Sequence, residues 1–122
     1  MTVNRPEHYI MSTYSLIISP ASENSPELRI DTLKIKKASI IVRAINHKLR
    51  QVILQLIGDR DKITVTEIFL HLRLEQSVAS QHLAILRKSG FVKTKREGKF
   101  IYYSVNRQRL LDLNKFVDEL LK

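Results

Sequence analysis

The stretch from Ser77 to Tyr103, SVASQHLAILRKSGFVKTKREGKFIYY, decides how this chain folds. Its first thirteen residues predict a helix that ends near Ser89, because Ala79, Leu83 and Leu86 recur at helical spacing. Gly90 follows as a natural left-handed cap. Two short strands, rich in aromatic and β-branched residues, then surround a turn at Glu97-Gly98. The stretch therefore predicts one helix followed by a cationic hairpin.

Downstream of this stretch, the sequence predicts one more helix. The two strands are expected over Phe91–Arg96 and Phe100–Val105, and Asn106 can cap the helix that follows. The apolar residues of this last helix recur every three or four positions, at Leu110, Leu113, Val117 and Leu120, with Leu111, Phe116 and Leu121 broadening the face.

Upstream, three more helices are expected. Thr64 and Glu67 have the spacing of a capping box for a helix that ends near Arg73. Before it, a helix over about Lys48–Ile57 is expected to stop at Gly58. The first helix begins after Asp31 as N-cap, and its apolar stripe is Leu33, Ala38, Ile41 and Ile45.

The resulting order is helix, helix, helix, helix, strand, strand, helix. This is a mainly α fold with a small β-hairpin, typical of a winged helix-turn-helix. Residues 31–122 are expected to form this domain. Residues 1–30 hold all three prolines and read as an N-terminal arm whose order the sequence leaves open, with Tyr14–Ile18 either a short strand or a segment that packs on a partner.

The positive charge is concentrated in the predicted domain. The chain has 21 Lys and Arg against 12 Asp and Glu, a net +9. Residues 1–30 carry two bases and three acids, whereas residues 31–122 carry 19 bases and nine acids. Such a charge suits a polyanion; a membrane surface or RNA would satisfy it as well as DNA, and a merely solvated basic face is the plainer interpretation. The helix and hairpin that carry the charge favour DNA.

Several classes of protein are excluded by composition. The chain has no cysteine, so disulfides and thiolate metal sites are absent. The apolar run Leu16-Ile17-Ile18 is too short for a signal sequence or a membrane span, which favours the cytoplasm. There is no glycine-rich phosphate loop and no pair of carboxylates with a supporting base, so an enzyme is not expected.

The polar start of the helix near Ser77 is the candidate for reading bases. Gln can bond adenine through two hydrogen bonds, and Ser can donate or accept at several base edges. The first turn and a half of such a helix approaches the bases, and it contains Gln76, Ser77, Ser80 and Gln81. The alternative is that the two serines only cap or decorate an exposed helix.

Basic residues around this helix are expected to contact phosphates, which position a protein without reading sequence. His82, in the middle of the helix, is a switch, a metal ligand or, as we prefer, a packing residue that reaches a phosphate. Of Tyr102 and Tyr103, one belongs in the core and the other offers its hydroxyl to the DNA backbone. The predicted backbone contacts are His82, Arg87, Lys88, Lys93, Lys95, Arg96, Lys99 and Tyr102.

The first and last helices carry more apolar residues than so small a chain can cover, which predicts a two-fold interface between two copies. The alternative is that both stripes close the core of a monomer. The residues expected at the interface are Leu33, Ile41, Leu110, Leu113, Phe116, Val117 and Leu120.

These motifs together resemble the ArsR (SmtB-like) family of winged-helix repressors. The resemblance covers about residues 37–122 and rests on AINHKLRQVIL at Ala44–Leu54, on L-x-L-x-Q-S-x-x-S-x-H-L-x-x-L-x-x-x-G-F-V at Leu72–Val92, and on the strand pair KREGKFIYYSV. It implies a homodimer formed by the first and last helices, bound to an imperfect inverted repeat near a promoter. In that family, residues matching Gln76, Ser77, Ser80 and Gln81 face DNA.

The chain departs from the family at its metal sites. Thr64 and Thr66 stand where many members have a cysteine pair, and hydroxyls do not replace thiolates for soft metals. A second family site would need ligands in the last helix, which reads Asp112-Leu113-Asn114 and contains no His. The family's Asp-Pro before the second helix is His47-Lys48 here. The histidines fall singly, so we expect no metal and no cofactor.

The sequence thus predicts a DNA-binding transcriptional regulator, a repressor that binds an inverted-repeat operator in double-stranded DNA as a homodimer, with no effector identified. Two alternatives stay open. One is a protein–protein interaction module that docks through residues 1–30, and the other is a nonspecific nucleic-acid binder, which would show no sequence preference.

Overall fold

The structure is a computed structural model that describes residues 14–122. The chain divides into two compact units, one up to Ile40 and one from Ile41 to Lys122, and each is described on its own. Every helix in the described range is too short or too polar to cross a membrane.

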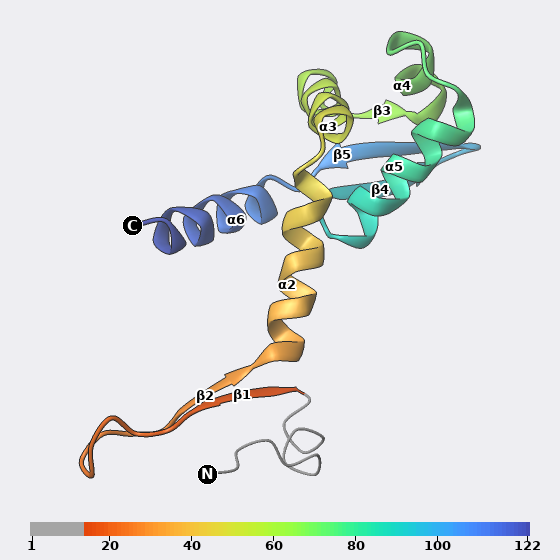
Figure 1. Cartoon of the computed structure of the whole chain (residues 1–122). Coiled ribbons are helices and arrows are strands. Elements are labelled where there is room, and N and C mark those ends of the chain that lie inside the picture. Colours follow the sequence, from red (N-terminus) through yellow and green to blue (C-terminus); the bar gives the residue numbers. More distant parts are fainter. Residues whose placement is uncertain (1–13) are drawn as a thin grey trace. The chain divides into compact units, whose positions relative to one another are not determined.

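The first unit contains a two-stranded antiparallel sheet (Figure 1). Strand β1 (Ser15–Ile18) pairs with β2 (Leu28–Asp31), so of the two alternatives for Tyr14–Ile18 the structure has the short strand. In the loop between the strands, the carbonyl of Ser22 accepts a hydrogen bond of 3.1 Å from the amide of Ser25. The described part of the predicted arm is thus a folded hairpin.

Helix α2 (Thr32–Ile45) follows β2 directly and crosses the boundary between the units. A carboxylate oxygen of Asp31 accepts hydrogen bonds from the amides of Leu33 (2.9 Å) and Lys34 (3.2 Å). The predicted N-cap is therefore confirmed. Because the two units meet inside a helix, the division into an arm 1–30 and a domain 31–122 stays a prediction.

The second unit begins its helical core with α3 (Lys48–Arg60). The expectation that Gly58 stops this helix is wrong. The helix continues through Gly58 and ends at Arg60; its C-cap Asp61 has a φ of 69° and lies in a tight turn in which the amide of Lys62 donates to the carbonyl of Arg60 at 2.8 Å. Gly58 instead packs against β5: a Cβ there would lie 3.8 Å from the Val105 side chain, an ordinary packing distance.

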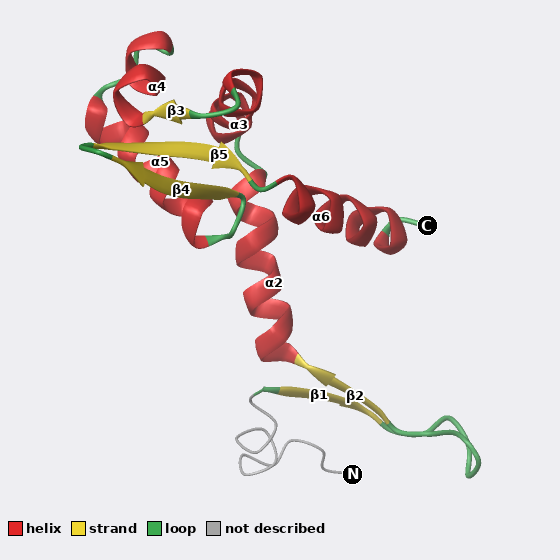
Figure 2. Ribbon diagram, turned by 180° about the vertical axis from the view of Figure 1, so that it is seen from behind, coloured by secondary structure: helices red, strands yellow, loops and turns green. Residues whose placement is uncertain are grey.

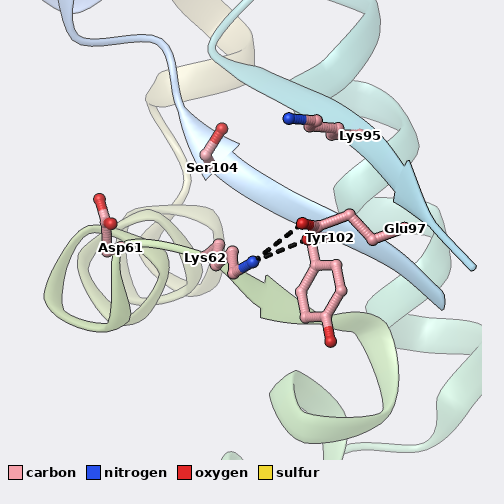
Figure 3. Close-up of a pocket in the computed structure, with 6 residues that line it drawn as sticks. All are labelled: Asp61, Lys62, Lys95, Glu97, Tyr102 and Ser104. Carbon is pink, nitrogen blue, oxygen red and sulfur yellow. Dashed lines mark hydrogen bonds and ion pairs between the residues drawn. The ribbon is translucent and has the colours of Figure 1, made fainter.

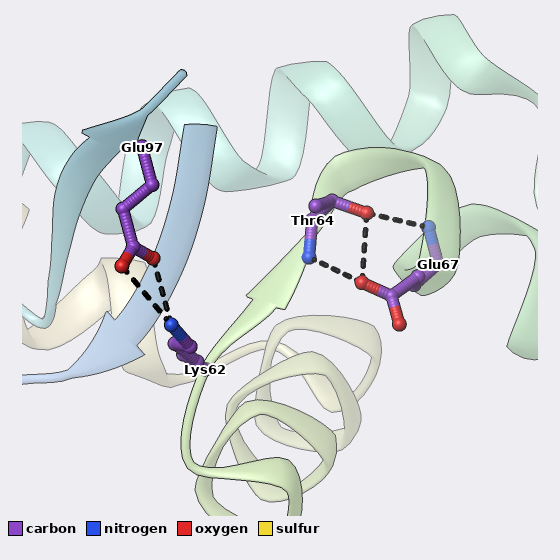
Figure 4. Close-up of polar contacts among 4 residues, drawn as sticks. All are labelled: Lys62, Thr64, Glu67 and Glu97. Carbon is purple, nitrogen blue, oxygen red and sulfur yellow. Dashed lines mark hydrogen bonds and ion pairs between the residues drawn. The ribbon is translucent and has the colours of Figure 1, made fainter. Parts of the chain in front are cut away.

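The predicted capping box opens α4 (Val65–His71). The Thr64 hydroxyl accepts from the amide of Glu67 at 3.2 Å, and the Glu67 carboxylate accepts from the amide of Thr64 at 3.1 Å (Figure 4). These bonds from the Thr64 amide and hydroxyl lower the pKa of Glu67 below its usual range. The cap thus fixes where the first helix of the helix-turn-helix begins.

A turn joins α4 to α5 (Gln76–Lys88), which starts one residue before the expected position. The strands β4 (Val92–Glu97) and β5 (Phe100–Val105) form the hairpin, with Gly98 at a φ of 64° in its turn. A short strand β3 (Ile63–Thr64), which the sequence analysis did not predict, pairs with the free edge of β5. Figure 2 shows β5 lying between β3 and β4.

The last helix, α6 (Arg107–Leu120), begins at the predicted cap. The Asn106 side-chain oxygen accepts from the amide of Arg109 at 3.3 Å, and its side-chain nitrogen donates to the carbonyl of Gly90 at 3.0 Å. Asn106 therefore also ties the start of α6 to the turn after α5.

One hydrophobic core lies between α3, α4, α5 and the three-stranded sheet. Its fully buried members are Ile53, Ile57, Ile63, Ile68, Leu83, Leu86 and Phe91. Tyr103 packs against this cluster, which confirms that one of the two tyrosines belongs to the core. The predicted fold class, mainly α with a small hairpin and the order of a winged helix-turn-helix, is confirmed.

Candidate nucleic-acid interface

Helix α5 has one face in the core and one in solvent. Ala79, Leu83 and Leu86 are buried to within 1% of full burial. Residues 76, 77, 80 and 81 lie on a different face, because each residue of an α-helix turns by about 100°. All four predicted base-reading residues are exposed: Gln76, Ser77, Ser80 and Gln81.

The side chains of these four residues are free to bond a ligand. Within the described part of the chain, none of them makes a hydrogen bond. The alternative that Ser77 caps the helix does not fit, because the N-cap position is Glu75 and has no side-chain cap bond. Ser77 and Ser80 thus retain both donor and acceptor capacity on an exposed helix face.

The same face continues toward the C-terminal end of α5, where Arg87 and Lys88 are exposed. Ala84 is also exposed and falls between the polar start and these two cations. A small apolar group in that position suits the methyl group of a thymine. Ala84 was not among the predicted contacts, because an alanine gives no polar signal in the sequence.

Arg73 is a second residue that the sequence analysis missed. It is exposed in the turn between α4 and α5, with a φ of 57°. A cation beside the start of a recognition helix suits a phosphate. The signal was its place in the turn of the helix-turn-helix, although its left-handed backbone could not be read from the sequence.

The predicted phosphate contacts of the hairpin lie on different sides of it. Val92 pairs with Val105 and Thr94 with Tyr103, and this face packs against the core that α5 shares. Because side chains alternate along a strand, Arg96 is on this helix-facing side near the tip. Lys93 and Lys95 are on the outer side, and Lys99 is exposed at the turn.

The outer side of the hairpin carries an ion pair at a pocket of about 220 Å³. The ammonium of Lys62 lies 2.7 Å from a carboxylate oxygen of Glu97 and 4.7 Å from the centre of the Tyr102 ring (Figure 3). The hydrogen bond with Glu97 raises the pKa of Lys62, and the same bond lowers the pKa of Glu97. Tyr102 and Lys95 also line this pocket, together with Asp61 and Ser104.

The side chain of His82 packs against Arg50 and His47. Its Nδ1 lies 3.2 Å from Nη1 of Arg50, and its ring centroid is 4.8 Å from that of His47. Because a guanidinium only donates, Nδ1 of His82 accepts, and a neutral ring carries its proton on Nε2. Burial, then His47 and then Arg50, lower the pKa of His82. The histidines fall singly in the sequence, but the fold brings His47 and His82 together.

Arg50 holds three elements of the second unit together. It is only 8% exposed. Its Nε donates to the carbonyl of Ala44 at 2.6 Å and its Nη2 to that of Arg43 at 3.2 Å. Those carbonyls belong to the last turn of α2, where helix carbonyls lack partners within the helix. Arg50 therefore links the end of α2 and the start of α3 to the middle of α5.

The residues predicted at a two-fold interface differ in burial. Ile41, Leu110 and Leu113 are half-buried and pack against the core. Val117 is also half-buried, whereas Leu33, Phe116 and Leu120 are exposed. Helix α6 buries none of its residues fully. The interpretation that both stripes only close a monomer core thus fits some of these residues but leaves the outer half of α6 uncovered.

Among residues 14–122, no group of three or more His, Cys, Asp or Glu side chains lies close enough to hold a metal ion. The pair His47 and His82 has the guanidinium of Arg50 beside it, and a fixed cation disfavours a second one. His8 lies outside the described residues. Thr64, at one position of the family's cysteine pair, uses its hydroxyl in the capping box.

Comparison with known proteins gives relatives across most of this domain. Residues 47–94 match bacterial regulatory proteins of the arsR family. An uncharacterised HTH-type transcriptional regulator of Methanocaldococcus jannaschii is 36% identical over 87 residues, covering 71% of this chain and 98% of that protein. The transcriptional activator HlyU of Vibrio cholerae is 36% identical over 70 residues, covering 57% of this chain and 64% of its own length.

The fold is also found among solved structures. The crystal structure of the transcriptional repressor PagR of Bacillus anthracis matches with a TM-score of 0.57 and 28% identity, covering 71% of this chain and 99% of that one. The match thus includes nearly all of a protein that is named a repressor.

Proposed function

The chain belongs to the arsR family of bacterial regulatory proteins, and from that premise we propose that it represses transcription by binding an inverted-repeat operator as a homodimer. That it is a DNA-binding transcriptional regulator, and no enzyme, follows from its family and relatives. The repeat, the dimer and the direction of regulation are the proposed parts. We place it in the cytoplasm with its DNA.

One observation carries this proposal: four polar side chains that make no hydrogen bond within residues 14–122 lie on the exposed side of a helix whose other side packs in the core. Because the core fixes this helix, Gln and Ser can be presented to base edges in the major groove, and only their own side chains lose conformational freedom on binding. Two such helices related by a two-fold axis would read half-sites roughly 34 Å apart.

The basic residues of the β4–β5 hairpin are given different roles according to the side of the hairpin on which they lie. Arg96 and Lys99, on the helix-facing side and at the tip of the hairpin, are assigned to phosphates of the duplex that α5 reads. Lys93 and Lys95 lie on the outer side, where Lys95 and Tyr102 share a pocket with Glu97. We propose that this second pair contributes to the long-range attraction and makes weaker contacts with the backbone.

Repression by occupying the promoter needs only DNA binding and dimerisation. Helix α5 and the β4–β5 hairpin would bind the DNA, and α2 and α6 would form the dimer. Among the relatives, PagR is named a repressor and HlyU an activator, so the direction of regulation needs its own measurement. A reporter downstream of a selected site should fall in expression when the chain is present. Metal is not proposed as a signal, because Thr64 and Thr66 stand at the family's cysteine positions and Thr64 is engaged in the cap.

The decisive experiment is selection of bound sites from random duplex DNA, followed by binding measurements on the recovered site. The expected result is an inverted repeat whose affinity falls steeply with salt, because neutralised phosphates release counterions. Gln81→Ala should lose preference at defined base pairs. Arg96→Ala with Lys99→Ala should weaken all sequences alike and reduce the salt slope by about 0.9 per lost phosphate contact.

The matched control is Lys93→Ala with Lys95→Ala, which removes the same charge from the other side of the hairpin and should have the smaller effect. If the Lys93 and Lys95 substitutions reduced DNA affinity more than those of Arg96 and Lys99, the assignment of the two sides of the hairpin would be reversed. Recovery of no site, with DNA binding indifferent to salt, would leave the interaction-module alternative in place of the proposed function.

A further inference from the structure

We propose that the hairpin of β1 and β2 packs its apolar face against a second copy of this chain and so enlarges the dimer interface. This inference rests on the proposed homodimer, but it adds a surface in residues 14–31, outside the winged helix-turn-helix. An apolar face requires an apolar, uncharged surface opposite it, and we propose that the second copy supplies this surface.

The hairpin has two unlike faces. In the antiparallel register, Leu16 lies opposite Ile30 and Ile18 opposite Leu28. Residues directly opposite each other, and residues two apart along a strand, share a face of a sheet. One face therefore consists of these four aliphatic side chains, whereas the other carries the pair of Ser15 and Asp31 and the pair of Ile17 and Arg29.

The apolar face is exposed. Its four residues are between 39% and 55% exposed, the least being Ile30 and the most Leu28. An isolated two-stranded sheet is marginally stable in water and needs a cover over its apolar side. Aliphatic groups concentrated on one face of the hairpin indicate that the cover is apolar.

The charge of the segment argues against DNA or a lipid surface as that cover. Residues 14–31 contain three acids, Glu23, Glu27 and Asp31, and a single base, Arg29, which pairs with Glu27 at 3.0 Å. Phosphate groups of either polyanion would be repelled by this segment. The rest of the chain carries the positive charge, so the hairpin is unlike every surface assigned to DNA.

Continuity with α2 argues for a second copy. Strand β2 ends at Asp31 and α2 begins at Thr32, and Asp31 caps the helix through the amides of Leu33 and Lys34. No flexible linker therefore separates the hairpin from a helix that is assigned to the dimer. The hairpin directly adjoins the first turn of α2. A second copy that packs against this turn would therefore also lie close to the hairpin.

The size of a stable interface points the same way. Such interfaces engage about 20–30 residues on each side. Two helices of 14 residues, α2 and α6, that each present half of their residues supply only about 14. The four residues of the hairpin face would raise this number to about 18, close to that range.

The absence of cysteine makes a direct test possible, because one introduced cysteine gives one reactive thiol. The full chain with Ile30→Cys is compared with Arg29→Cys, its neighbour on the opposite face. The rate of maleimide labelling is measured from well below to well above the dimerisation concentration, which sedimentation velocity gives on the same samples. The expected result is that labelling of Ile30→Cys slows by about tenfold as dimer forms, while labelling of Arg29→Cys does not change.

Each other outcome overturns the inference. Slow labelling of Ile30→Cys at every concentration would mean that the same chain covers the face. Fast labelling in the dimer would mean that the face stays open, and this would leave the dimer through α2 and α6 intact. A chain that stays monomeric would remove the inference together with the proposed homodimer.

A charge placed on each face gives an independent measurement. Leu16→Asp should raise the dimer dissociation constant by about 10- to 100-fold, because a carboxylate would be buried against apolar groups. Ile17→Asp, one residue away on the other face, should leave it nearly unchanged. Equal effects of the two substitutions would contradict the proposed face.

Discussion

The segment from α3 to β5, here called the reading head, and the last helix α6 belong to the same compact unit but differ in how far their apolar residues are buried. The reading head buries seven large side chains completely, from Ile53 to Phe91, whereas α6 buries none and leaves Phe116 and Leu120 exposed. A region with a closed core is stable through its own contacts. An exposed apolar stripe marks a surface on which a partner can pack.

Replacing a core aromatic should have the largest effect and should not depend on protein concentration. Phe91 is fully buried beneath Arg109, so Phe91→Ala is expected to lower the free energy of unfolding by about 3–5 kcal/mol. Phe100→Ala, at a half-exposed position on β5, should change it by less than about 0.5 kcal/mol. Urea unfolding measures both, and a similar loss in the two variants would refute the contrast.

The link through Arg50 should give the next largest effect, because it joins the reading head to the end of α2. Arg50→Met keeps the aliphatic stem but removes the donors to the carbonyls of Ala44 and Arg43, at a cost of about 2–3 kcal/mol. Lys48→Met, an exposed change in the same helix turn, is the control and should be nearly neutral. An unchanged urea midpoint for Arg50→Met would show that the link does not stabilise the fold.

A charge on α6 should act on assembly and spare the reading head. Phe116→Asp is expected to weaken the dimer by about 10- to 100-fold, or about 1.4–2.7 kcal/mol, with its circular dichroism spectrum retained. Lys115→Asp changes the neighbouring residue, outside the apolar stripe. Sedimentation equilibrium distinguishes the two variants, and a dimer that tolerates Phe116→Asp would contradict the role given to α6.

The smallest expected effect is a dependence of stability on pH through His82. Its pKa is lowered in the folded state, mainly by burial, from an ordinary value of 6.5. The unfolded chain therefore takes up the proton first, so stability should be lost as pH falls below the unfolded value. The urea midpoint of the wild type should fall between about pH 7.5 and about pH 5.5 by more than that of His82→Gln. Equal falls in the two proteins would exclude His82 as the cause.

Local signals predicted most of the reading head. The capping box at Thr64 and Glu67, the buried face of α5 and the left-handed Gly90 all depend on residues within a few positions of each other. Gly58 shows where such signals fail: a glycine can end a helix or lie within one, and here α3 continues to Arg60 with the side chain of Val105 packed beside Gly58. Strand β3 was missed because two residues carry no strand period, and it forms only at the edge that β5 offers.

The candidate interface was predicted in part. The exposed start of α5 follows from helical spacing, since the buried residues fix which residues face solvent. The sides of the hairpin on which Arg96 and Lys95 lie depend on its register and on which face α5 covers. The meeting of His47, Arg50 and His82 spans 35 residues and depends on how α3 packs against α5.

The sequence by itself determined the helices, the hairpin, the charge excess and the polar tip of α5, because capping, periodicity and turn chemistry act over a few residues. The tertiary structure decided which side chains became partners. Arg50 donates to the carbonyls of α2 and to His82, and Lys62 pairs with Glu97. In the first hairpin, four of the apolar residues share one face. Such pairings depend on which segments meet within each unit, and that is set by strand register in the first unit and by packing around the core in the second.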